Sequence, residues 1–148
     1  MVHLEDLEWI GKKHSETKDT KWASWQFLDA LDEVSGKVTS DVGVYIIRTS
    51  ISFRRLKGSS RILYIGEGQL YERLDAIDTL NGRHTARDRF WRYFREFPAA
   101  KLDFAYLAEE DGQTQKKLSK AQAKQLEDWL LEDYEENHLE LPPFNHQK

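Results

Sequence analysis

Two short apolar segments near the middle of the chain constrain its fold most strongly. VGVYIIR (42–48) and RILYIG (61–66) are rich in β-branched and other apolar residues, as is typical of buried strands. Between them lies SISFRRLKGSS, whose glycine is a turn signal. The pattern therefore predicts a β-hairpin whose connecting segment can form a basic extension.

The rest of the chain predicts helices and one more strand. Apolar residues at helical spacing predict helices over residues 21–34, 69–80, 85–97 and 119–138. LDFAYLA (102–108) alternates like a third strand. The resulting order is helix, β, β, α, α, β, α, without an internal repeat, and it predicts an α+β fold.

Composition narrows the class of protein. A length of 148 residues fits one domain, and the lack of cysteine excludes disulfides and thiolate metal sites. Neither the first residues, MVHLEDLEWIGKKHSE, nor any later run is apolar enough for a signal peptide or a membrane span. We therefore expect a soluble cytoplasmic protein with no membrane partner.

Charge is distributed unevenly along the chain, although the net charge is only −4. Residues 1–47 hold 5 Lys/Arg and 9 Asp/Glu, residues 48–101 hold 12 and 6, and residues 102–148 hold 5 and 11, so the sums are −4, +6 and −6. A basic middle between acidic flanks is compatible with a local site for a polyanion, because the field over one face steers phosphate. Ordinary solvated surface charge explains the same pattern equally well.

One carboxylate and one guanidinium fall among apolar residues of the predicted helices. Glu127 lies inside the apolar arc of the last helix, where an ionised carboxylate is costly unless it is paired or binds a cation. Arg73 lies inside the apolar arc of the 69–80 helix and can either extend over the core edge or present its guanidinium to a carboxylate or phosphate. The alternative for Glu127 is an ion pair with an arginine. Tyr45 and Tyr64 occupy central strand positions, where tyrosine is an ordinary packing residue.

Five features follow one another in chain order: Gly43-Val44-Tyr45, Tyr64-Ile65-Gly66, Arg73, Glu127 and Asn145. This order resembles that of the GIY-YIG endonuclease superfamily, which includes homing endonucleases, some restriction enzymes and the incising domain of bacterial excision repair. The resemblance implies a small three-stranded antiparallel sheet flanked by helices in ββαβα order. It also implies a nuclease-like domain over residues 41–148, preceded by an N-terminal helical extension over residues 1–40.

The resemblance further implies a role for each matching residue. Glu127 would hold one divalent cation, Mg²⁺ or Mn²⁺, at the scissile phosphate. Tyr45 would orient or deprotonate the attacking water, with Tyr64 beside it; a phenol needs nearby positive charge to act as a base. Arg73 would stabilise negative charge on the phosphoryl oxygens.

The remaining matches concern how the site is held open. Asn145 would brace the site by hydrogen bonding, and Gly66 would leave space near the second tyrosine. Gly68 would let the chain turn into the next helix. Some branches of the family place a histidine four residues after the arginine, where this chain has Ile77. His84 can take that role after an insertion, or it is a helix-capping or surface histidine.

The spacing from Tyr64 to Arg73 is one residue shorter than in many members of the family. The turn at EGQ (67–69) is therefore expected to be tight.

The arginines of the basic middle are the predicted contacts to the DNA backbone: Arg54, Arg55 and Arg87, with Lys57, Arg89, Arg92 and Arg95. The sequence thus predicts a metal-dependent endonuclease that hydrolyses DNA phosphodiester bonds. The alternatives are a catalytically silent nucleic-acid-binding module and a protein-interaction domain that uses the acidic last helix.

Overall fold

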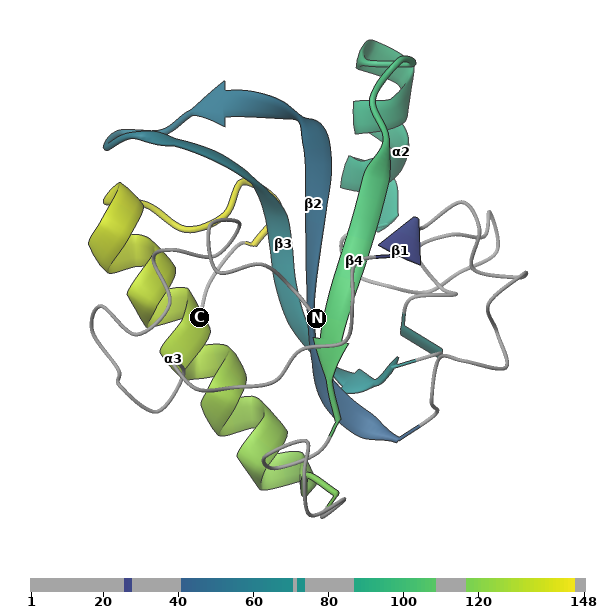
Figure 1. Ribbon diagram of the computed structural model, residues 1–148, viewed down its shortest axis with the longest axis vertical. Helices are drawn as coiled ribbons and strands as arrows, with labels where there is room; N and C mark the ends of the chain where they lie inside the picture. The colour runs from purple at the N-terminus through teal and green to yellow at the C-terminus, as the bar shows by residue number, and fades with distance from the viewer. Residues whose placement is uncertain (1–25, 28–40, 71, 74–86, 109–116, 146–148) are drawn as a thin grey trace.

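The computed structural model describes residues 26–27, 41–70, 72–73, 87–108 and 117–145, and it has an α+β fold (Figure 1). Its elements are β1 (Gln26–Phe27), β2 (Val42–Arg54), β3 (Ser59–Gln69), α2 (Arg87–Glu96), β4 (Leu102–Leu107) and α3 (Lys120–His138). Within these ranges no helix is long and apolar enough to cross a membrane.

The three long strands form an antiparallel sheet in the order β4-β2-β3, which confirms the predicted three-stranded sheet. The hairpin is longer than predicted, because both strands continue through the polar connecting segment to a turn at Gly58. Gly58 has a φ of 71°, and its carbonyl oxygen accepts a hydrogen bond of 2.9 Å from the Arg55 N–H. A left-handed residue suits glycine, which has no Cβ to clash.

The prediction of a helix over residues 21–34 is wrong at Gln26 and Phe27. These two residues form β1, which pairs with Phe104 and Asp103 at the outer edge of β4. The edge of β4 offers unpaired backbone groups, and pairing with them overrides the helical spacing of the segment. The other residues of the proposed N-terminal extension lie outside the described ranges.

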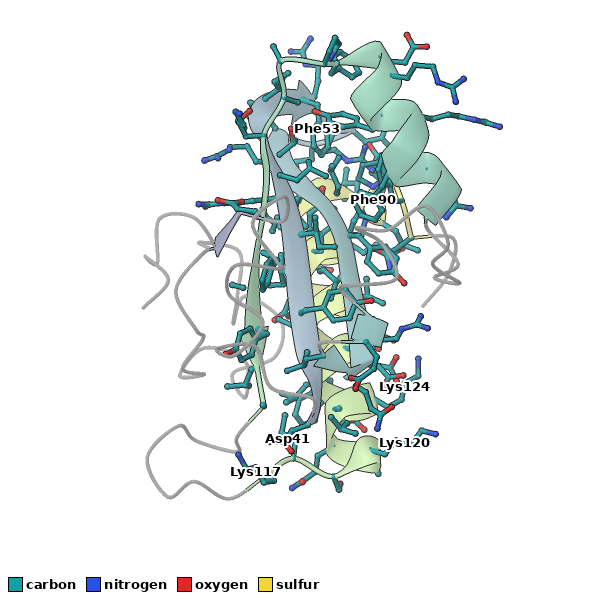
Figure 2. All side chains as sticks on the ribbon, turned by 90° about the vertical axis from the view of Figure 1, so that its right-hand side faces the viewer. Asp41, Phe53, Phe90, Lys117, Lys120 and Lys124 are labelled. Carbon is teal, nitrogen blue, oxygen red and sulfur yellow. The ribbon has the colours of Figure 1, made fainter. Side chains whose placement is uncertain are left out.

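Side chains of β2 alternate between two apolar cores, one on each face of the sheet. Val44 and Ile46 point to a core that includes Leu130 and Leu131 of α3. On the opposite face, Tyr45 and Ile47 belong to a second core, which contains Phe90 of α2 and is bordered by Phe53. Figure 1 shows α3 and α2 on opposite sides of the sheet, and Figure 2 shows Phe53 near Phe90 at the end of the sheet beside α2.

The last helix has almost the predicted bounds, because its sequence contains a capping signal. Ser119 is the N-cap: its Oγ accepts a hydrogen bond from the Gln122 N–H, and the Gln122 side chain accepts one from the Ser119 N–H. This reciprocal pair is a capping box. At the other end, Leu139 takes a left-handed conformation with φ of 64° and donates its N–H to the carbonyl of Glu135. These caps define a 19-residue helix that carries Glu127 near its middle.

Candidate functional site

The two motif tyrosines meet over Gly66. Tyr45 on β2 is fully buried and lies opposite Gly66 in the register of β2 and β3. The rings of Tyr45 and Tyr64 are 6.0 Å apart between centroids. A Cβ at Gly66 would lie 2.6 Å from the Tyr45 hydroxyl oxygen and 2.7 Å from Cε1 of Tyr64. Only glycine leaves room for both rings at this position, which agrees with the space predicted for it.

Arg73 reaches the same place from the chain segment that follows β3. Its backbone is helical, like that of Leu70 and Glu72, and the rest of the predicted 69–80 helix is outside the described residues. The stem of Arg73 lies across Gly68: a Cβ there would be 3.0 Å from the Arg73 Cγ. Gly68 has a φ of 138°, which few side chains tolerate. The guanidinium of Arg73 is within hydrogen-bonding reach of Tyr45.

The environment of Tyr45 favours the neutral phenol. Burial raises the pKa of Tyr45 well above its usual value, and the nearby Tyr64 raises it further. The Arg73 charge and hydrogen bond lower the pKa of Tyr45, but they do not offset burial, and Glu127 adds a smaller increase. The positive charge that a phenolate would need is therefore present but insufficient.

Glu127 is largely shielded from solvent and is paired within its own helix. Its side chain is 13% exposed, and its Oε1 lies 2.8 Å from Nζ of Lys124, which is 51% exposed and also lies 3.4 Å from Oδ1 of Asp128. Burial raises the pKa of Glu127, the Lys124 ammonium lowers it, and the carboxylates of Glu67 and Asp128 raise it. The alternative to cation binding was an ion pair with an arginine; the structure shows an ion pair with a lysine one turn earlier.

Figure 2 shows Lys124 close to Lys120, at the end of α3 near Asp41 and Lys117. The ammonium of Lys117 is paired with Asp41 at 2.9 Å. Lys124 therefore belongs to a group of lysines around the first turns of α3, and it is the member of that group that reaches Glu127.

Glu67 is a second carboxylate at this site, and the sequence analysis did not single it out. We expected a tight turn at residues 67–69, but β3 continues through Gln69. Glu67 is therefore a strand residue opposite Val44. Its Oε2 is buried and accepts no hydrogen bond from any part of the chain that the structure describes. The signal in the sequence was a carboxylate directly after the strand motif, between two glycines.

Asn145 fixes the strand that carries Tyr64. Its side-chain Oδ1 accepts a hydrogen bond from the Ile65 N–H at 3.0 Å, and its Nδ2 donates one to the Ile65 carbonyl at 2.9 Å. The preceding Phe144 N–H donates to the Leu63 carbonyl at 2.9 Å, and the Phe144 carbonyl accepts from Nη1 of Arg89. The C-terminal segment therefore lies along the outer edge of β3 on both sides of Tyr64, as the bracing role of Asn145 predicts.

The predicted DNA contacts fall into different environments. Arg54 is exposed near the tip of the hairpin. Arg55, in contrast, is 10% exposed in its side chain, pairs with Glu140 at 2.9 Å and donates to the Leu141 carbonyl. Arg87 is the first residue of α2, and His84 lies outside the described residues. Arg92 of α2 is exposed.

The site can hold a small hard cation with help from other ligands. Among the residues that the structure describes, no three His, Cys, Asp or Glu side chains are grouped to bind a metal. Mg²⁺, however, is usually bound by one or two protein carboxylates together with water and substrate phosphates. The buried Oε2 of Glu67, which lacks a donor, and the shielded Glu127 fit that requirement.

Comparisons of the chain with protein-family models, with curated proteins and with solved structures found no match.

Proposed function

We propose that the protein is a metal-dependent endonuclease of the GIY-YIG type, which hydrolyses DNA phosphodiester bonds. The observation that carries this proposal is the convergence of two tyrosines, an arginine and a glutamate from β2, β3, α3 and the segment after β3. Tyr45 interacts with Tyr64, with Arg73 and electrostatically with Glu127. A cluster of a phenol, a guanidinium and a carboxylate contains the groups that water attack on a phosphodiester needs.

In the proposed reaction the neutral Tyr45 orients the attacking water through its hydroxyl group. The raised pKa of Tyr45 supports this role over that of a general base. Arg73 donates hydrogen bonds to the phosphoryl oxygens; its buried Nε has no acceptor in the described part of the chain. Asn145 is a positioning residue, because it holds the Ile65 backbone next to Tyr64.

Glu127 would hold the divalent cation, Mg²⁺ or Mn²⁺. When bound, such a cation acts as a Lewis acid that stabilises negative charge on the phosphate and on the leaving oxygen. Lys124 has to share or release the Glu127 carboxylate for this, and its half-exposed side chain has the freedom to do so. For the DNA backbone we propose the exposed Arg54 and Arg92, with Arg87; Arg55 is largely committed to Glu140.

One observation favours a second candidate function. The Lys124 ammonium already neutralises Glu127, in the way a bound cation would. A permanent pair of this kind fits a nucleic-acid-binding module without turnover. The two candidates differ in their dependence on metal.

The experiment is a nicking assay on supercoiled plasmid with Mg²⁺, with Mn²⁺ and with EDTA. The nuclease proposal predicts nicking that requires the metal and stops with EDTA. Single-stranded DNA, branched DNA and RNA serve as further substrates. Inertness on all four substrates with both metals would contradict the proposal, and DNA retention that weakens steeply with salt would then support the binding module.

A further inference from the structure

Glu67 lies on the same side of the sheet as Glu127. In the register of β2 and β3 it pairs with Val44, and paired residues of antiparallel strands point to the same face. Val44 belongs to the core that α3 covers. The carboxylate of Glu67 therefore points to the α3 side, and it is close enough to Glu127 to interact electrostatically with it.

A cation pairs with Glu127 but not with Glu67 in the described part of the chain. Lys124 pairs with Glu127 and Asp128, and within the described ranges no cation pairs with Glu67. Oε2 of Glu67 is buried and has no hydrogen-bond donor there. A buried anionic oxygen is costly unless a cation or a donor meets it, and a neighbouring carboxylate increases the cost.

We propose that Glu67 is a second ligand of the divalent cation, together with Glu127. This inference deepens the proposed function and rests on it for the presence of a cation. Two carboxylates suit Mg²⁺ or Mn²⁺, whose other positions are filled by water and substrate phosphate. Because Glu67 points to the α3 face, the ion would be held on that face, between β3 and α3.

The test is a titration of the whole chain with Mn²⁺ in the absence of nucleic acid. The concentration of unbound Mn²⁺ is measured by electron paramagnetic resonance. Glu67→Gln keeps the shape of the side chain and removes the charge. We expect it to weaken Mn²⁺ binding at least about tenfold, since even changes to residues that only support ligands cost about 10–100-fold. The matched control is Glu72→Gln, an exposed glutamate shortly after β3, which should leave binding unchanged.

A structural role for Glu67 gives different results. If the side chain only supported the fold, Glu67→Gln would lower the unfolding midpoint and leave the Mn²⁺ affinity of the folded protein as it is. Glu67→Asp keeps the charge and should retain part of the affinity. Wild-type affinity in folded Glu67→Gln, or no Mn²⁺ binding by the wild-type protein, would overturn the inference.

Nicking by the same variants separates this inference from the proposed function. Mn²⁺ binding that requires Glu67 and Glu127, in a protein that cleaves nothing, would sustain the second ligand and refute the nuclease. Metal-dependent nicking with unchanged Mn²⁺ affinity in Glu67→Gln would sustain the nuclease and refute the second ligand.

Discussion

Gly66 allows the two tyrosine rings to lie close together, because both rings pack against a residue that has no side chain. The Cβ of any other residue would stand 2.6 Å from Tyr45, in a core where Tyr45 is fully buried. Close-packed interiors absorb such an intrusion by moving side chains out of their preferred rotamers.

Gly66→Ala should therefore lower the free energy of unfolding by about 1–3 kcal/mol and reduce nicking, as measured by urea denaturation and the plasmid assay. Gly58→Ala at the hairpin turn is the control. A Cβ at Gly58 meets its nearest atom at 3.9 Å, so its cost is the backbone strain of a positive φ, about 1–2 kcal/mol, without an effect on nicking. Full activity and stability of Gly66→Ala would show that the two rings do not need the space left by the missing side chain.

Tyr45 should act as a neutral phenol over the pH range in which the protein is folded. Its pKa is raised well above the usual value, so a base mechanism would require the rate to rise with pH into the alkaline range. We expect Tyr45→Phe to reduce the nicking rate about 10²-fold through loss of a positioned hydrogen bond. The rate of the wild-type protein relative to this variant should stay constant with pH. A ratio that grows steadily with pH would restore Tyr45 as the base.

Glu127 should make the stability of the protein depend on pH. Burial raises the pKa of Glu127 in the folded state above the ordinary 4.5. Lys124 lowers this pKa, and Glu67 and Asp128 raise it further. The folded state therefore binds a proton more readily than the unfolded state. The stabilisation from protonated Glu127 is fully present below pH 4.5 and is lost as the pH rises through the raised value.

Glu127→Gln removes this titration and keeps the shape of the side chain. Relative to the variant, the wild-type protein should lose free energy of unfolding as the pH increases from about 4.5, as measured by urea denaturation at a series of pH values without metal. A difference that stays constant with pH, or that changes in the opposite direction, would contradict the burial effect.

At the scale of elements, the C-terminal segment behaves as a clamp on β3. Asn145 both donates to and accepts from the Ile65 backbone, as a paired strand residue would. Asn145→Ala loses both hydrogen bonds and should cost about 1–3 kcal/mol in the free energy of unfolding, because the Ile65 groups are left without partners. Asn145→Asp places an acceptor against the Ile65 carbonyl and should cost at least as much. An Asn145→Asp protein with the wild-type free energy of unfolding would show that these hydrogen bonds do not hold the C-terminal segment against β3.

The sequence predicted those elements whose signals are local. The bounds of α3 followed from its apolar spacing, and the structure confirms them within a residue and adds the capping box of Ser119 and Gln122. The length of the hairpin was missed because the segment after Arg48 was taken as a polar connection, although Ile51 and Phe53 alternate with Ser50 and Ser52 there. β1 was missed because its pairing with β4 depends on a distant strand edge.

The candidate site was predictable only in part for the same reason. Tyr45, Tyr64 and Arg73 meet as the motif implied. The Lys124 partner of Glu127 lies at helical spacing, three residues earlier, and was open to prediction. The position of Glu67 on the sheet could not be predicted, because it depends on β3 continuing through Gln69. A turn had been expected there.

At the scale of the molecule, the fold brings together side chains from early and late parts of the chain, since Tyr45 interacts with Tyr64, with Arg73 and electrostatically with Glu127. β2 supplies Tyr45, β3 supplies Tyr64, and α3 supplies Glu127 from the opposite face. Of the basic residues between 48 and 101, Arg54 at the end of β2 and Arg92 on α2 are exposed. The central claim is that this cluster is a catalytic centre that depends on the Glu127 carboxylate.

The most direct test compares the Mg²⁺-dependent nicking rates of the wild-type protein, Glu127→Gln and Glu136→Gln. Glu136 is an exposed residue on the same helix and controls for the loss of one negative charge. We predict that Glu127→Gln lowers the rate at least about 10²-fold and that Glu136→Gln leaves it unchanged. Equal rates for all three proteins would show that the cluster is not the catalytic centre.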